Sequence, residues 1–182
     1  MRPALFLDRD GVLNRTVKEN GTTRAPKSLD ELQLLPGVLD ALARAAKSFP
    51  LVVITNQTDV AHGLITQDEV EEIHAVLRRT LPLSAILTCF HNDKAGCDCH
   101  KPRPGCFLRA AAQLDLDLPR SFAVGDHWIH TAAARSAGCG MTYLIRGPND
   151  EWTRCPPDFV VTDLAEAVDR ISTTQAVARP AE

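Results

Sequence analysis

Short apolar runs alternate along the chain with segments in which apolar residues recur at helical spacing. The apolar runs predict strands at residues 3–7, 51–54, 85–90, 121–124, 141–145 and 159–161. The helical spacing predicts helices at residues 37–48, 66–80 and 104–114, from just after 126 to about 137, and at 164–171. Strands that alternate with helices are typical of an α/β domain in which helices cover both faces of a mostly parallel sheet. We therefore expect one Rossmann-like, three-layer domain at residues 1–172, followed by a flexible tail at 173–182.

Three of the predicted strands end in a polar residue. Asp8, Thr55 and Asp126 each follow a buried apolar run. In open sheets of this kind, ligands bind beyond the carboxyl ends of the strands. The sequence therefore predicts that these three side chains share one edge of the sheet and that a binding site lies there.

The composition is that of an ordinary globular domain. The chain has 182 residues, of which 45% are apolar, and its net charge is −3; these values fit one domain with a full core. The lack of a basic field weighs against nucleic acid as a partner. No apolar run approaches the roughly 18 residues needed to cross a bilayer, and no secretory pattern stands at the N-terminus. We expect a cytoplasmic monomer that does not bind membranes.

Asp8 and Asp10 carry the most specific chemical signal. They lie two residues apart just past a buried strand, and Gly11 lets the backbone turn so that both can face a cleft. One carboxylate can attack phosphorus while the other protonates the leaving alkoxide and later activates water. Because an anion then approaches an anion, the site needs a cation, and Mg²⁺ suits carboxylates, a backbone carbonyl and water. Taken alone, such an acid pair more often consists of two solvated side chains in an ordinary surface loop.

Further groups support a phosphate site. Thr55 and Asn56 follow the second strand, where a hydroxyl and backbone N–H groups can hold phosphate oxygens. Lys101 offers a positive charge for a transferring phosphoryl group, and Asp126 offers another carboxylate for magnesium. The order Asp-x-Asp, Thr, Lys, Gly-Asp along the chain resembles the haloacid dehalogenase superfamily of phosphatases over residues 4–165.

A closer resemblance rests on LDRDGVLN at 7–14, LPGV at 35–38, VITNQ at 53–57 and the loop at 89–102. These stretches resemble the D-glycero-D-manno-heptose 1,7-bisphosphate phosphatase family, and the histidinol-phosphate phosphatases are close relatives of that family. The resemblance implies that Asp8 is the nucleophile, that Asp10 is the general acid and base, and that Thr55 and Lys101 stabilise the phosphoryl group.

The same resemblance implies a set of metal and substrate contacts. Magnesium would be bound by Asp8, the backbone carbonyl of Asp10, and Asp126. The substrate would be bound by Asn56, Gln57, His100 and Lys101. The implied fold is a haloacid dehalogenase-like domain.

Four residues of the loop at 89–101 predict a zinc site independently of the resemblance. Cys89, His91, Cys97 and Cys99 offer three thiolates and one imidazole, the donor set of a closed tetrahedral site. Disulfides or free buried thiols are the alternatives, but a reducing cytosol disfavours disulfides. Because zinc with four protein ligands cannot activate water, we expect it to hold the loop and to set the direction of Lys101.

The spacing of the motifs argues against a separate lid domain. The intervals 9–54 and 56–100 must already hold a flap, two helices, two strands and the zinc loop. We therefore expect no cap domain and an open cleft, with residues 15–26 and the zinc loop as its walls. Such a cleft suits a small polar phosphate ester, above all a sugar phosphate.

Histidines replace charged family residues at four positions, namely His62, His100, His127 and His130. Two explanations stay open: a degraded active site, or an intact phosphoryl-transfer site with changed substrate contacts. The retention of Asp8, Asp10 and Lys101 favours the second. Because histidine titrates near pH 6.5, we expect His127 and His130 to tune the site, with activity falling on acidification through about pH 6 to 7.

These observations leave three functions open. The first is a magnesium-dependent phosphomonoesterase that acts through a phospho-aspartate, resembling a D-glycero-D-manno-heptose 1,7-bisphosphate 7-phosphatase. The second is a phosphatase for histidinol phosphate or another small phosphate ester. The third is a catalytically silent domain that binds phosphate ligands or a partner protein.

Overall fold

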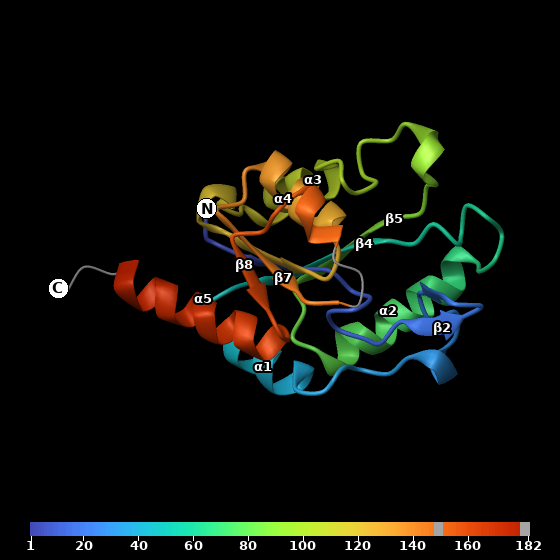
Figure 1. Cartoon of the computed structure of the whole chain (residues 1–182), viewed down its shortest axis with the longest axis horizontal. Helices are drawn as coiled ribbons and strands as arrows, with labels where there is room; N and C mark the ends of the chain where they lie inside the picture. Colours follow the sequence, from blue (N-terminus) through green and yellow to red (C-terminus); the bar gives the residue numbers. More distant parts are fainter. Residues whose placement is uncertain (148–150, 179–182) are drawn as a thin grey trace.

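A six-stranded sheet, parallel at every pairing, forms the centre of the protein (Figure 1). The computed structural model describes the backbone of residues 1–147 and 151–178 and the side chains of residues 1–147 and 153–174. Across the sheet the strand order is β5-β4-β1-β6-β7-β8. The order reverses between β1 and β6, the kind of switch point at which open α/β sheets bind ligands. The strands are β1 (Leu5–Leu7), β4 (Leu51–Asn56), β5 (Ala85–Cys89), β6 (Phe122–Gly125), β7 (Met141–Ile145) and β8 (Phe159–Val161).

Helices cover both faces of this sheet, which makes three layers (Figure 1). One face carries α1 (Val38–Ala45), α2 (Gln67–Thr80) and α5 (Leu164–Ala178), and the other carries α3 (Gly105–Leu114) and α4 (Trp128–Ala137). Leu5 and Leu7 pack toward the first set, whereas Phe6 packs toward the second, because successive side chains of a strand point to opposite faces. Burial on both faces explains the continuous apolar runs. The predicted three-layer α/β architecture is confirmed.

The last helix is longer than the apolar pattern predicts. The pattern ends at residue 171, whereas α5 continues to Ala178. The hydroxyls of Ser172, Thr173 and Thr174 donate to carbonyls four residues before them at 2.8–3.0 Å, so these polar side chains are satisfied within the helix. The predicted start of a tail at residue 173 therefore falls inside a helix and is wrong, and residues 179–182 lie outside the described residues.

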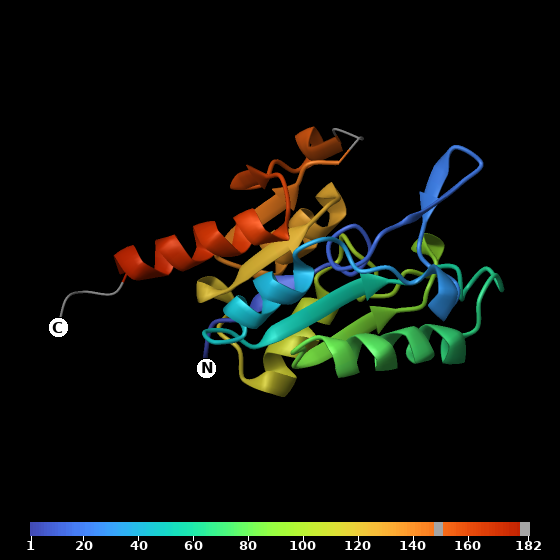
Figure 2. The same ribbon diagram turned by 90° about the horizontal axis from the view of Figure 1, so that it is seen from below.

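A small hairpin lies between β1 and α1 and was not predicted. Its strands, β2 (Val17–Glu19) and β3 (Thr22–Arg24), are antiparallel and extend away from the sheet (Figure 2). Asn20 and Gly21 join them with φ values of 48° and 78°. An Asn-Gly pair with positive φ is the preferred two-residue hairpin turn, so this dipeptide was the available signal.

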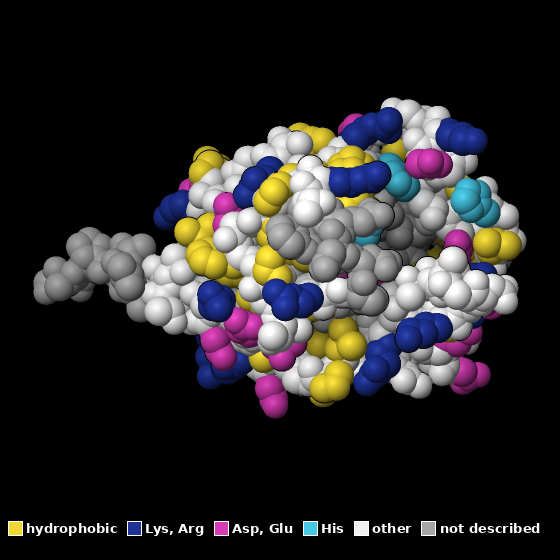
Figure 3. Space-filling model, in the orientation of Figure 1, with side chains coloured by type: hydrophobic (Ala, Val, Ile, Leu, Met, Phe, Trp, Pro, Cys, Tyr) yellow, Lys and Arg dark blue, Asp and Glu magenta, His cyan; other side chains and the backbone are white. Residues whose placement is uncertain are grey.

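The segments between the motifs are short and hold only the elements named below, which leaves no room for a cap domain. Between β1 and β4 the chain holds the hairpin, the 3-10 turn Leu29–Glu31 and α1. Between β4 and α3 it holds α2, β5 and the 3-10 turn Asp93–Ala95. Within the described residues, no helix is both long and apolar enough to pass through a bilayer. On the face shown in Figure 3, acidic and basic side chains are interspersed.

The start of α2 allows a test of local stability. Thr66 Oγ1 accepts a hydrogen bond from the Glu69 N–H at 3.2 Å, and the Glu69 carboxylate accepts one from the Thr66 N–H at 2.7 Å. We expect Thr66→Ala to lower the free energy of unfolding by about 1 kcal/mol in urea titrations, because both bonds of the capping box are lost or weakened. Thr80→Ala, in the last turn of the same helix, should cost less. Equal losses for the two variants would contradict this account.

Candidate active site

The predicted catalytic residues line one cavity at the carboxyl ends of the strands. The cavity has a volume of about 300 Å³. From the sequence-predicted set it is lined by Asp8, Asp10, Thr55, Asn56, Gln57, Lys101, Asp126 and His127. The segment before α1 contributes Thr16, Thr23, Arg24 and Ala25, and the remaining wall is Thr58, Asp59 and Ile129. The strand ends therefore gather these side chains as expected, with residues 15–26 forming part of the wall.

Asp8 and Lys101 form a buried ion pair at the floor of this cavity. Lys101 Nζ lies 2.6 Å from Asp8 Oδ2 and also donates to the Ile54 carbonyl at 2.9 Å. The other carboxylate oxygen, Oδ1, accepts from the Arg9 N–H at 2.9 Å. Burial by itself raises the pKa of Asp8, but the Lys101 charge and the neighbouring His130 outweigh it and hold that pKa far below its usual range. Asp8 is therefore an anion at neutral pH.

Asn56 holds the backbone on which Lys101 is carried. Its side-chain Oδ1 accepts from the Lys101 N–H at 3.1 Å, and its Nδ2 donates to the Lys101 carbonyl at 3.2 Å. The Lys101–Pro102 peptide bond is cis. Asn56 lines the cavity, as expected of a substrate contact, but both polar atoms of its side chain already bind the chain itself.

His130 lies beneath the ion pair, and its side chain is buried. Its Nδ1 is 3.2 Å from Lys101 Nζ and 3.5 Å from Asp8 Oδ2. Because an ammonium group only donates hydrogen bonds, Nδ1 accepts and the imidazole is neutral. Burial, followed by the charge of Lys101, lowers the pKa of His130 against the opposing effect of Asp8. The expectation that His130 titrates near pH 6.5 is therefore wrong, because its environment moves the titration to lower pH.

The acids of the cavity make a site that fits a divalent cation. Asp126, Asp8 and Asp10 give the cavity three carboxyl groups, of which Asp8 pairs with Lys101 and Asp10 with Arg9. Burial and the charge of Asp8 raise the pKa of Asp126 to about 7, which shows that this negative charge is incompletely compensated. Gly11 allows the close approach: its φ is +79°, and a Cβ atom there would lie 1.9 Å from Asp126 Oδ2. Carboxylate oxygens are the donors that Mg²⁺ prefers.

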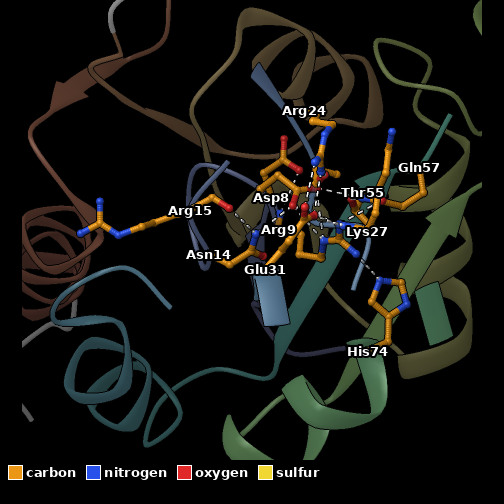
Figure 4. A network of polar contacts seen from close by, with 12 residues as sticks. Asp8, Arg9, Asn14, Arg15, Arg24, Lys27, Glu31, Thr55, Gln57 and His74 are labelled. Atoms are coloured by element: carbon orange, nitrogen blue, oxygen red, sulfur yellow. Dashed lines mark hydrogen bonds and ion pairs between the residues drawn. The ribbon is translucent and has the colours of Figure 1, made fainter. Parts of the chain in front are cut away.

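Asp10 is held on both carboxylate oxygens by a partly buried polar network, whose members Arg9, Asn14 and Gln57 are labelled in Figure 4. Arg9 donates to Oδ1 and Oδ2 at 3.0–3.2 Å, Asn14 donates to Oδ1 at 2.9 Å, and Gln57 donates to Oδ2 at 2.8 Å. Gln57 also donates to Thr55 Oγ1 at 2.8 Å and accepts from Arg9 at 2.9 Å. Gln57 was predicted as a substrate contact; the structure places it in the cavity wall with its amide bound to Arg9, Asp10 and Thr55.

The predicted zinc ligands converge. The donor atoms of Cys89, His91, Cys97 and Cys99 all lie within 4.8 Å of one another. Ligands of a tetrahedral ion with Zn–S bonds near 2.3 Å lie about 3.8 Å apart. The Cys89–Cys97, Cys89–His91 and Cys89–Cys99 separations are 3.8, 3.6 and 3.3 Å, so the donor set and its spacing fit zinc.

The thiol pKa values show the same charge problem as the acids. Burial, followed by the hydrogen bond with Cys99, raises the pKa of the Cys89 thiol strongly. For Cys97, burial acts upward, but hydrogen bonds with Cys99 and the His100 N–H lower the pKa to about 7. Thiolates packed this closely repel one another, and a bound cation removes that repulsion.

Of the other replaced histidines, His127 lines the cavity, whereas His62 and His100 do not. His100 Nδ1 is 3.1 Å from the His91 carbonyl and 3.8 Å from Cys89 Sγ, so its ring faces the zinc loop, and it is not among the described residues that line the cavity. His62 is exposed on the loop before α2. His100 was predicted as a substrate contact, and the structure does not bring it together with the others.

The outer wall of the cavity is built around Arg24. Its guanidinium donates to Glu19 at 2.9 Å and to Glu31 at 2.7 and 2.8 Å, which ties the hairpin to the 3-10 turn at residues 29–31 (Figure 4). Lys27 Nζ lies 3.8 Å from Asp59, which also lines the cavity. These contacts give the wall a defined position beside the ion pair.

Comparison with known proteins agrees with this geometry. The model of the haloacid dehalogenase-like hydrolase family matches residues 4–138. The chain belongs to the haloacid dehalogenase-like hydrolase family. It is 35% identical to the D-glycero-beta-D-manno-heptose-1,7-bisphosphate 7-phosphatase of Bordetella bronchiseptica, over 92% of this chain and 96% of that one. It is 32% identical to the enzyme of the same name from Escherichia coli K12, over 97% of each.

Solved structures give the same result for the fold. A crystal structure of D,D-heptose 1,7-bisphosphate phosphatase from B. bronchiseptica, complexed with magnesium and phosphate, has a TM-score of 0.80 at 32% identity and covers 96% of this chain and 99% of that one. A putative haloacid dehalogenase-like phosphatase from Mesorhizobium loti has a TM-score of 0.77 at 29% identity and covers 100% of this chain and 90% of that one. The family and these relatives identify the protein as a phosphoric monoester hydrolase.

Two polar residues of this hydrolase were not singled out from the sequence. Arg9 stands between the two acids and is fully buried, and His74 is a buried residue of α2 that contacts it at 3.0 Å. Arg9 could have been found, because a cation between two acids on a buried strand end must be paired. His74 gives no local signal, since its partner is distant in sequence.

Gly11 provides a test of the acid cluster. We expect Gly11→Ala to be more destabilising than Gly63→Ala, although both residues have positive φ. The two variants share the cost of a left-handed alanine, about 1 kcal/mol. Only residue 11 adds an overlap with Asp126, expected to cost a further ~1–3 kcal/mol; nothing lies within 4 Å of a Cβ at residue 63. Chemical denaturation measures the difference, and equal losses would show that Asp126 does not approach residue 11 this closely.

Proposed function

We propose that the protein is a magnesium-dependent phosphomonoesterase that hydrolyses a sugar phosphate through a phospho-aspartate on Asp8. The observation that carries the proposal is the buried Asp8–Lys101 pair at 2.6 Å, at the carboxyl edge of the sheet and beside Asp10, Thr55 and Asp126. D-glycero-D-manno-heptose 1,7-bisphosphate, with cleavage at C7, is the first candidate substrate, because the relatives named for that reaction align over nearly the whole chain.

In the first chemical step, a carboxylate oxygen of Asp8 attacks phosphorus. The bond between phosphorus and the ester oxygen breaks, and Asp10 gives its proton to the leaving alkoxide. Lys101 and Thr55 line the same cavity as Asp8, so an ammonium and a hydroxyl would be available to stabilise the charge that develops on the phosphoryl oxygens.

In the second step, water attacks the phosphorus of the phospho-aspartate. Asp10, now a carboxylate, takes a proton from this water, the bond from phosphorus to the Asp8 oxygen breaks, and inorganic phosphate leaves. Both acids return to their starting protonation states. Bound at Asp8, Asp126 and the carbonyl of Asp10, Mg²⁺ would neutralise the charge between nucleophile and phosphate.

A second candidate is a phosphatase for histidinol phosphate or another small ester. It is favoured by the position of His100, which replaces the arginine that the family uses for substrate contact and turns toward the zinc loop. An imidazole in that position cannot reproduce the bidentate grip of a guanidinium on a second phosphate. A panel with both heptose 1,7-bisphosphate anomers and histidinol phosphate separates the two candidates.

We propose further that zinc at Cys89, His91, Cys97 and Cys99 is structural. All four positions are protein ligands, which leaves none for water. The ion would fix the loop that ends at Lys101 and, with it, the position of the ammonium.

The nucleophile is tested by Asp8→Asn. We expect the release of phosphate from the best panel substrate in Mg²⁺ to fall by roughly 10³-fold or more, because an amide does not attack phosphorus. The melting temperature should fall, because Lys101 loses its buried counter-ion and the relief of repulsion between Asp8 and Asp126 offsets only part of this cost; activity is therefore compared below the unfolding transition of the variant. Asp40→Asn, on the exposed side of α1, serves as the control. Wild-type protein without turnover on the whole panel would instead favour a silent phosphate-binding domain.

The metal loop is tested by zinc analysis. Mass spectrometry of acid-digested protein from zinc-supplemented cells should find about one zinc per chain, and Cys99→Ser should lose it. Strong chelation should lower the melting temperature of the wild type, since binding energy is folding energy in such sites. Cys139→Ser, which changes a partly buried thiol outside the cluster, should retain the metal. Zinc-free wild-type protein would refute the assignment.

A further inference from the structure

A chain of buried contacts connects helix α2 to Asp10 (Figure 4). The Arg9 guanidinium has no exposed surface. One side of it binds the Asp10 carboxylate and the Gln57 amide oxygen. The far side, NH1, lies 3.0 Å from His74 Nε2. On the opposite edge of the imidazole, Nδ1 lies 3.2 Å from Glu71 Oε1.

The chemistry of these contacts fixes the state of His74. A guanidinium carries only donors and stays protonated, so Nε2 must accept from Arg9 and carries no proton. The ring proton is therefore on Nδ1, where the Glu71 carboxylate accepts it. Burial, followed by the charge of Arg9, lowers the pKa of His74 to about 4, against the pull of Glu71. The imidazole is thus a neutral acceptor at the pH of the cytoplasm and well below it.

This acceptor limits how Arg9 can lie. A planar guanidinium with partners on one side only can rotate or shift within its pocket, whereas partners on both sides define its plane. Among the described residues, His74 is the hydrogen-bond acceptor recorded for NH1. Because Arg9 also fixes Gln57, and Gln57 donates to Asp10 and Thr55, a shift of Arg9 would move the acid and the hydroxyl together.

We propose that His74 is a positioning residue for the acid–base function of Asp10, acting through Arg9. The inference rests on the proposed function, in which Asp10 protonates the leaving group. Proton transfer in the transition state requires the acid to stand within hydrogen-bond reach of the departing oxygen. His74 contributes to that placement from a helix outside the cavity, without touching the substrate.

The leaving group distinguishes this role from simple stabilisation. The C7 ester of the heptose bisphosphate leaves as an alkoxide and needs a general acid, whereas p-nitrophenyl phosphate leaves as a stable phenolate and hardly needs one. The readout is kcat/KM, which reports the steps up to formation of the phospho-aspartate, because hydrolysis of that intermediate is common to both esters. We expect Asp10→Asn to lose about 10²–10⁴-fold in kcat/KM on the heptose ester and far less on the aryl ester. His74→Leu should show the same selectivity, with a loss in kcat/KM of about 10-fold or more on the heptose ester and a change below about 3-fold on the aryl ester.

Rescue and a matched control complete the test. His74→Gln places an amide oxygen where Nε2 accepts, and should restore most of the kcat/KM lost on the heptose ester. Leu77→Ala, one turn further along α2 in the core, should destabilise the protein without selectivity for the leaving group. Should His74→Leu not fold, Glu71→Ala, which removes the acceptor of the ring proton, should give a smaller selective loss.

Several outcomes would overturn the inference. The first is an equal loss on the two esters for His74→Leu, or for Glu71→Ala where His74→Leu does not fold. The second is the same selectivity in Leu77→Ala. The third is a lack of rescue by His74→Gln. If Asp10→Asn itself shows no selectivity, or the wild type does not hydrolyse the heptose ester, the proposed function fails first, and the inference falls with it. Selectivity in Asp10→Asn but not in His74→Leu leaves the proposed function standing and rejects the role of His74 alone.

Discussion

The ion pair between the Asp8 carboxylate and the Lys101 ammonium sets the arrangement of the whole site. Both groups are almost inaccessible to water, so each charge needs the other in place of the solvent it has lost. Such a pair contributes little net stability, but removing either member leaves a buried charge that is costly. Its effect is therefore geometric: the end of β1 and the end of the zinc loop must meet. Lys101 and Arg9 pair with Asp8 and Asp10, yet the pKa of Asp126 is still raised to about 7 by burial and by the charge of Asp8, so a divalent cation would complete the site.

The position of Lys101 depends on a loop that apolar packing holds only in part, through Cys89, Cys97 and Cys99. The loop at 89–101 contains one short 3-10 turn at 93–95 and is polar over much of its length. Its anchors are the bidentate contact with Asn56, the Ile54 carbonyl, and the converging thiol and imidazole ligands. In the proposed function, metal ligation would add to these contacts in holding the loop. A structural zinc would then help to define the position of Lys101.

Much of this arrangement could be predicted from the sequence, because the signals are local or follow from topology. Buried strands that end at Asp8, Thr55 and Asp126 must meet at one edge once the sheet is parallel, and four zinc ligands close in sequence must converge. The directions of side chains could not be predicted. A motif places Asn56, Gln57 and His100 near the site, but only the packed structure shows their polar atoms bound to the protein itself. The predicted end of α5 at residue 171 was wrong because the hydroxyls of residues 172–174 form hydrogen bonds within the helix itself.

The histidine beneath the ion pair bears on whether the site has decayed. His130 presents a neutral nitrogen that accepts from Lys101 at 3.2 Å. Because this acceptor carries no charge, it holds the ammonium without adding a further anion, and the field of Lys101 acts on Asp8 and on any group bound in the cavity. His130 therefore keeps Lys101 in contact with the Asp8 carboxylate, an arrangement that supports an intact phosphoryl-transfer site over a degraded one.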